Sequence, residues 1–204
     1  METLKVACIR WGTKYNDLYV TRLKSMVARH LSVPHEFVCY TDRPVEGVTC
    51  LPLPSDLPTW WSKVGLFREP AGPTLYLDLD VVICAPIVLP ELSDKLWALD
   101  DFSYSLTRPK AVDGTINSSV MYWQGDFTEV WTKFTPAVMD RLHGDQNWIT
   151  RCLWPDRISL VPEGFACSHK YHIERGLKRA PITVYHGNPK PSDVGGAWIR
   201  QNWQ

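Results

Sequence analysis

One stretch of the sequence decides the fold, Leu75-Tyr76-Leu77-Asp78-Leu79-Asp80-Val81-Val82-Ile83. It lies between Gly72-Pro73 and Pro86, and its aliphatic and β-branched residues are typical of a buried strand. Two carboxylates interrupt this apolar run. Because strand side chains alternate with a period of two, we expect Asp78 and Asp80 to leave the same face of the strand.

Two carboxylates beside an apolar interior repel each other and are costly to remove from water. A divalent cation, a proton, or a strand end that runs out into a cleft would relieve that cost. Ligands of open α/β sheets bind outside the carboxyl ends of the strands. The D-x-D of Asp78 and Asp80 therefore predicts a metal-assisted site, and a merely solvated strand end is the alternative.

Strands and helices alternate on both sides of this stretch. A strand at residues 6–9, a helix from Asn16 or Asp17 to Leu31 and a strand at residues 37–40 predict a right-handed parallel unit. Later strands are expected at residues 48–53, 96–99, 116–123, 158–161 and 182–185. Helices are expected at residues 60–67, at 127–134 and from Asp145, and a surface loop at 107–115. The fold class is therefore α/β, a single Rossmann-like domain over residues 1–204 with a central, mainly parallel mixed sheet flanked by helices.

The composition excludes some classes of protein. The 22 Lys and Arg residues balance 22 Asp and Glu residues, so no positive field favours nucleic acid as a partner. No apolar run approaches the roughly 20 residues of a membrane helix, and no secretory signal opens the chain, so we expect no membrane segment. The six cysteines are dispersed, without a C-x-x-C pair. This pattern favours reduced thiols and a cytoplasmic location.

Other polar residues follow the predicted elements. Asp42 ends the strand at 37–40, where it would meet a ribose or base, or cap the turn. Lys63 precedes the D-x-D strand, where it would reach an anionic ligand or lie exposed on its short helix. Asp145 opens a helix, a position where a carboxylate is normally a cap. The loop from His186 to Lys190 contains a metal-ligand residue type, a glycine and a cation.

Four stretches in chain order resemble glycogenin and the related retaining glycosyltransferases of GT-A fold. They are Asp78-Leu79-Asp80, Asn117-Ser118-Ser119-Val120, Gly144-Asp145-Gln146 and the loop His186-Gly187-Asn188-Pro189-Lys190-Pro191, similar to the family's D-x-D, N-S-G-V, G-D-Q and H-x-x-G-x-x-K-P motifs. Ser62-Lys63 is similar to a family S-K before the D-x-D strand. Ser119 replaces the usual glycine, and the last loop is two positions shorter than in the family.

The resemblance implies a GT-A-type domain that transfers a hexose, with retention, from a nucleotide-diphosphate sugar to a glycan or other hydroxyl acceptor. The donor would be UDP-linked. The implied metal is Mn²⁺, with Mg²⁺ possible, held by Asp78, Asp80 and His186. Lys190 would face the β-phosphate and Lys63 the donor sugar or phosphate.

The resemblance also implies roles for residues along the cleft. Asp145 and Gln146 would lie beside the anomeric carbon, as a nucleophile or as groups that assist front-face attack. Asn117 would orient the donor sugar or the acceptor. The remaining substrate contacts are Asp42 and Tyr15 at the nucleoside end, and Asp100 or Asp101 at sugar hydroxyls or in a plain strand-end turn.

Two rival functions remain open. Haloacid-dehalogenase-type phosphatases also present D-x-D-x-[TV] after an apolar strand, and use the first aspartate as nucleophile. Asp78 to Val82 satisfies that pattern, but that motif normally lies near the N-terminus, and it leaves the Gly144-Asp145-Gln146 and His186–Lys190 stretches unexplained. The second rival is a non-catalytic module that binds a nucleotide sugar or glycan.

Overall fold

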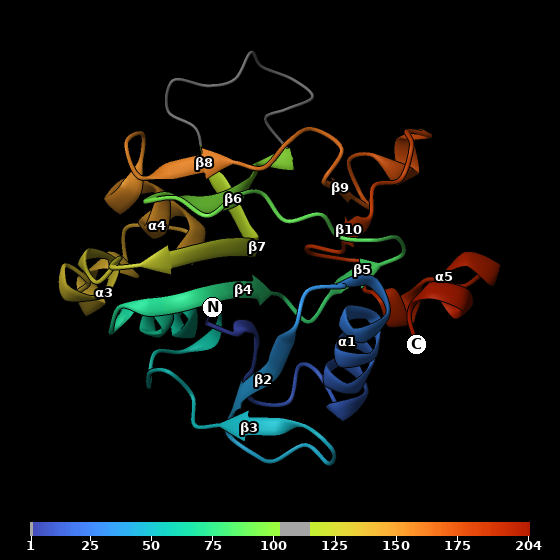
Figure 1. Ribbon diagram of the computed structural model, residues 1–204, viewed down its shortest axis with the longest axis horizontal. Helices are drawn as coiled ribbons and strands as arrows, with labels where there is room; N and C mark the ends of the chain where they lie inside the picture. The colour runs from blue at the N-terminus through green and yellow to red at the C-terminus, as the bar shows by residue number, and fades with distance from the viewer. Residues whose placement is uncertain (1, 103–114) are drawn as a thin grey trace.

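The computed structural model describes residues 2–102 and 115–204. Its larger sheet contains seven strands in the order β3-β2-β1-β4-β7-β6-β8, which lie side by side from bottom to top in Figure 1. They are β1 (Leu4–Arg10), β2 (His35–Thr41), β3 (Thr49–Leu51), β4 (Ala71–Leu77), β6 (Leu96–Asp100), β7 (Ile116–Gly125) and β8 (Ile158–Leu160). Only β7 runs antiparallel to its neighbours, β4 and β6. The predicted α/β class with a mainly parallel mixed sheet is confirmed.

A second, three-stranded sheet has the order β5-β10-β9 and lies to the right in Figure 1. Its strands are β5 (Val81–Ile83), β9 (Ala166–Ser168) and β10 (Ile182–Val184). The helices and 3₁₀ turns are α1 (Asp17–His30), η1 (Thr59–Phe67), α3 (Glu129–Thr132), η2 (Pro136–Val138), α4 (Asp145–Leu153), η3 (Ile173–Arg175), η4 (Pro191–Asp193) and α5 (Ala197–Asn202).

Apolar residues cover both faces of the larger sheet. Along β1, Val6 and Cys8 belong to the core that contains the apolar face of α1, whereas Ala7 belongs to the core formed with η1 and α4. This alternation is what a strand buried on both faces requires. The α1 core also includes β5 and β10, so it joins the two sheets.

The apolar run at residues 75–83 is not one strand, and that prediction is wrong. β4 ends at Leu77, residues 78–80 turn, and Val81 begins β5 in the other sheet. The chain changes sheets here because Leu77 pairs with Val120 of β7, whereas Val81 pairs with Val184 of β10. Asp78 and Asp80 therefore do not share a strand face; they lie in the turn between the two sheets.

Smaller differences concern the second half of the chain. The helix predicted at 127–134 is only the single turn of α3, and β9 was not predicted. The surface loop predicted at 107–115 lies outside the described residues except for its last position.

All six cysteines are free thiols, as predicted. Within the described ranges, no helix has the length and apolar character needed to cross a bilayer.

Candidate active site

A cavity of about 580 Å³ opens where β1 and β4 end and β7 begins. The residues from the sequence prediction that line it are Tyr15, Lys63, Asp78, Asp80, Asp101, Asn117, Asp145, Gln146, His186 and Lys190. Two other predicted residues, Asp42 and Asp100, are not among its lining residues. The folded chain thus gathers most of the predicted site at one edge of the sheet.

Lys63 is the buried cation of this cavity. It lies on η1, and its Nζ is 3.1 Å from Asp78 Oδ1 and 3.3 Å from Asp145 Oδ2. Its Nζ also donates to Ser118 Oγ at 3.0 Å. Burial alone would lower the pKa of the Lys63 ammonium, but the Asp145 and Asp78 carboxylates outweigh burial and raise that pKa. Lys63 is therefore a fixed positive charge, and the alternative of an exposed helix lysine is wrong.

Asp145 is the first residue of α4, after the N-cap Gly144. Its carboxylate does not act as a helix cap; Oδ2 accepts a 2.6 Å hydrogen bond from Ser118 Oγ and pairs with Lys63. Burial raises the pKa of Asp145, and the Lys63 charge and the Ser118 hydrogen bond oppose this rise. A buried carboxylate is thus held in a set orientation next to Gln146, which also lines the cavity.

Asp80, in the turn between the two sheets, is the centre of a second polar group. Its Oδ2 accepts a 2.8 Å hydrogen bond from the Tyr15 hydroxyl. The same oxygen forms an ion pair with the Lys190 ammonium. Lys190 Nζ also donates to the Tyr185 carbonyl at 3.0 Å. Burial, reinforced by the Asp80 charge, raises the pKa of the Tyr15 hydroxyl, so this hydroxyl keeps its proton and acts as a hydrogen-bond donor. The terminal loop therefore brings Lys190 into the cavity.

Tyr76 and Ser118 were given no role in the sequence prediction, yet both contact its acidic residues. The Tyr76 hydroxyl donates to Asp78 Oδ1 at 2.8 Å, and burial followed by the Asp78 charge raises its pKa well above the ordinary value. Tyr76 stands two positions before Asp78, so strand periodicity could have identified it. Ser118 lies inside the quoted N-S-S-V stretch, but nothing in that stretch shows that its hydroxyl joins Lys63 to Asp145.

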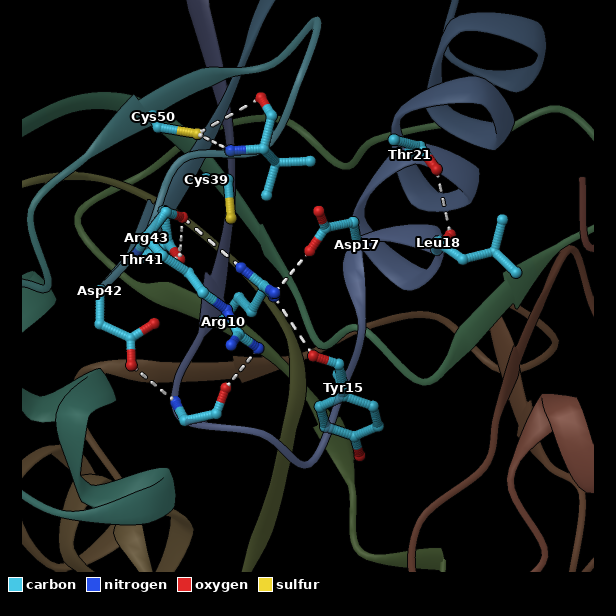
Figure 2. Close-up of polar contacts among 12 residues, drawn as sticks. Arg10, Tyr15, Asp17, Leu18, Thr21, Cys39, Thr41, Asp42, Arg43 and Cys50 are labelled. Atoms are coloured by element: carbon cyan, nitrogen blue, oxygen red, sulfur yellow. Dashed lines mark hydrogen bonds and ion pairs between the residues drawn. The ribbon is translucent and has the colours of Figure 1, made fainter.

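The loop between β1 and α1 carries Tyr15 into the site, and the buried Arg10 holds this loop (Figure 2). Arg10 Nε donates to the Tyr15 carbonyl at 3.2 Å, and Nη2 pairs with Asp17 Oδ1 at 2.5 Å. Asp42 Oδ2 accepts a 3.0 Å hydrogen bond from the Gly12 N–H, where the chain has φ +60°. In the structure Asp42 thus supports the loop from outside the cavity.

His186 lies at the cavity wall after β10. Its Nε2 is 2.7 Å from Ser168 Oγ, and its ring stacks on Tyr171 with centroids 5.3 Å apart. Burial lowers the pKa of His186, which favours the neutral ring that a metal ligand needs.

The side chains fit a divalent cation in kind. Two carboxylates and a neutral imidazole are ligands that Mn²⁺ and Mg²⁺ accept. Within residues 2–102 and 115–204, however, no three His, Cys, Asp or Glu side chains gather into a metal-binding group. Lys190 pairs with Asp80 and Ser168 contacts His186 Nε2. A cation bound by Asp80 and His186 would therefore exchange with these partners.

Comparison with solved structures identifies the fold. An active-site mutant of LgtC superposes with a TM-score of 0.66 at 13% sequence identity, over 97% of this chain and 93% of that one. The chain has the fold of a GT-A glycosyltransferase. The galactosyltransferase LgtC, in complex with donor and acceptor sugar analogs, gives a TM-score of 0.61 at 15% identity, over 92% of this chain and 88% of that one.

GlyE, a glycosyltransferase in Streptococcus pneumoniae TIGR4, matches with a TM-score of 0.64 at 15% identity. The match spans 96% of this chain but only 58% of GlyE. By sequence, no family model matches the chain and no curated protein does. The likeness therefore concerns the fold, at identities too low to carry over substrates or residue roles.

Proposed function

We propose that this chain transfers a glycosyl group from a nucleotide-diphosphate sugar to a hydroxyl acceptor. The observation that carries the proposal is the pair of ion pairs made by the buried Lys63. Its ammonium bridges Asp78 and Asp145 in the wall of one cavity. The solved structures that resemble this chain in fold are glycosyltransferases. A glycogenin-like, UDP-linked and retaining reaction is the finer form of the proposal, supported by the four sequence motifs.

The donor diphosphate belongs in the part of the cavity lined by Asp80, His186 and Lys190. The Lys190 ammonium offers charge to a phosphate oxygen, as leaving-group stabilisation requires. Mn²⁺, or Mg²⁺ in its place, would be held by Asp78, Asp80 and His186. When bound, it would supply positive charge to the departing diphosphate.

The reaction breaks the bond between the anomeric carbon and the diphosphate oxygen and forms a bond from that carbon to the acceptor oxygen. The diphosphate keeps the bonding electron pair, and the acceptor hydroxyl gives up its proton. In this proposal Asp145 and Gln146, which both line the cavity, would face the anomeric carbon. Lys63 and Ser118 hold the Asp145 carboxylate through an ion pair and a hydrogen bond. Asn117 lines the same wall and would orient the sugar or the acceptor.

Nucleotide release tests the proposal. The protein is incubated with Mn²⁺ and a panel of nucleotide sugars, and free nucleoside diphosphate is measured with and without simple glycosides as acceptors. We expect release from one UDP-sugar, lost on addition of a chelator and in Asp80→Ala. Lys133→Met, an exposed change outside the cavity lining, is the matched control and should keep the wild-type rate.

The same samples separate the rival functions. Turnover of a phosphate monoester that is inhibited by fluoroberyllate would contradict glycosyl transfer and indicate a haloacid-dehalogenase-type phosphatase instead. Saturable UDP binding without release from any donor would replace it by a non-catalytic module.

A further inference from the structure

Two tryptophans line the cavity with exposed indole rings. Trp60 is 47% exposed and Trp11 40%, whereas the next residue after Trp60, Trp61, is 5% exposed and packs in the core. Large apolar rings that face water inside a cavity that charged side chains also line are more informative than single apolar residues elsewhere on a surface.

The backbone before Trp60 is held in an unfavourable conformation. Thr59 has φ +55°, the one positive φ at a non-glycine residue in the described part of the chain. A β-branched residue rarely adopts this region, and such conformations persist only where the surroundings impose them. Thr59 opens η1, so this conformation sets the direction in which the chain presents Trp60 to the cavity.

The indole of Trp60 packs against the segment that carries the candidate catalytic residues. A Cβ atom at Gly144 would lie only 3.1 Å from Trp60 Nε1, so the glycine permits the close approach. The His143 ring lies 6.5 Å from the Trp60 ring, centroid to centroid, and is exposed. Asp145 and Gln146 follow immediately, and all of these residues line the cavity.

The polar and aromatic parts of the cavity suit different parts of a substrate. Lys190, Asp80 and Tyr15 form one connected charged group, which suits the diphosphate. Trp60 packs against Gly144, the residue directly before Asp145, and the His143 ring lies beside the indole. An indole face suits the apolar C–H face of an uncharged pyranose ring, and an imidazole suits its hydroxyls.

We propose that Trp60 and His143 form a stacking subsite for the acceptor sugar, an inference that rests on the proposed glycosyl transfer. In this subsite the acceptor ring lies on the indole, and its attacking hydroxyl is directed toward the segment beginning at Asp145. Trp60 is then a residue that determines acceptor specificity, and donor binding does not depend on it.

Steady-state kinetics test this subsite with the UDP-sugar that shows turnover, and with methyl glucosides, methyl galactosides, maltose and lactose as acceptors. In Trp60→Ala we expect KM for the acceptor to rise about three- to tenfold, the range of an aromatic stacking contact, while KM for the donor stays within about twofold. Trp60→Tyr should restore most of the acceptor affinity because it keeps an aromatic face. The matched control is Trp131→Ala, which removes a half-buried indole that packs on Arg68 and does not line the cavity.

A binding experiment gives a result even if no donor is turned over, so failure of the proposed function is distinguished from failure of the subsite. The protein is labelled with 5-fluorotryptophan, and the ¹⁹F resonances missing from Trp60→Phe and from Trp131→Phe are assigned to Trp60 and Trp131. We expect a saccharide of the same panel to shift this resonance and to leave that of Trp131 in place. An acceptor KM unchanged in Trp60→Ala, or a Trp60 resonance that no saccharide shifts, would overturn the proposal.

Discussion

At the scale of single residues, Lys63 holds the site together. Its side chain is 7% exposed and bridges Asp78 and Asp145. Removing one partner of a buried ion pair leaves the other charges uncompensated, which costs about 3–5 kcal/mol. We therefore expect Lys63→Met to lower the free energy of unfolding by about 3 kcal/mol at neutral pH, measured by urea denaturation, whereas Lys133→Met should lie close to wild type.

The loss in Lys63→Met should depend on pH. Without the Lys63 charge, the pKa of buried Asp145 rises further above its ordinary value of 3.8. The folded variant then holds a proton that the unfolded chain has released, so its stability falls as pH rises from about 4 toward neutrality. The difference from wild type should be smallest in acid and grow toward pH 7; a difference that is constant over this range would contradict the assignment.

Lys190 and a divalent cation would compete for Asp80. In the structure the Lys190 ammonium already pairs with Asp80 Oδ2. Lys190→Met should therefore raise the affinity for Mn²⁺ about tenfold in the absence of nucleotide, and lower the affinity for UDP, both measured by calorimetry. If both affinities fall together, Lys190 does not compete with the metal.

His186 can be tested with the same titrations. An imidazole favours Mn²⁺ over Mg²⁺, whereas carboxylates accept either. We expect His186→Ala to weaken Mn²⁺ binding more than Mg²⁺ binding. Equal losses for the two metals would remove His186 from the set of ligands.

At the scale of elements, the loop between β1 and α1 depends on one buried side chain. Arg10 binds the Tyr15 carbonyl and Asp17, and a linear apolar side chain cannot replace these donors (Figure 2). Arg10→Met should lower the free energy of unfolding by about 1–3 kcal/mol, the cost of a buried acceptor left without its donor. Amide exchange at residues 11–16 should accelerate while exchange in α4 stays unchanged, and equal acceleration in both segments would indicate a global effect instead.

Sequence periodicity predicted most elements but not where the sheet changes. Leu79 and Val81 continue the apolar character of Leu77, because the core that joins the two sheets buries all three. A continuous apolar run cannot distinguish one long strand from two short strands in different sheets. The break is set by long-range pairing with Val120 and Val184, which a local pattern does not contain.

At the scale of the whole molecule, the site is an assembly of distant segments. Lys63, Ser118 and Asp145 meet through η1, β7 and α4. The motifs predicted many of the residues that line the cavity, since several of them follow strands that end at one edge. They did not predict their pairing, because the hydroxyl of Ser118 and the ammonium of Lys63 find their partners only when these elements pack. Asp42 was predicted to contact the nucleoside because it ends a strand, but in the structure it lies outside the cavity lining and accepts a hydrogen bond from the Gly12 N–H.

The central claim is that Asp78 and Asp80 serve to bind the diphosphate of a nucleotide sugar through a divalent cation. Calorimetric titration of UDP into the protein in the presence of Mn²⁺ tests it most directly. The Asp80→Ala variant is titrated in the same way, at a temperature at which thermal denaturation shows both proteins to be folded. We expect saturable binding by the wild type that requires Mn²⁺ and is lost in Asp80→Ala. Equal UDP affinity in both proteins, or affinity unchanged by a chelator, would contradict the claim.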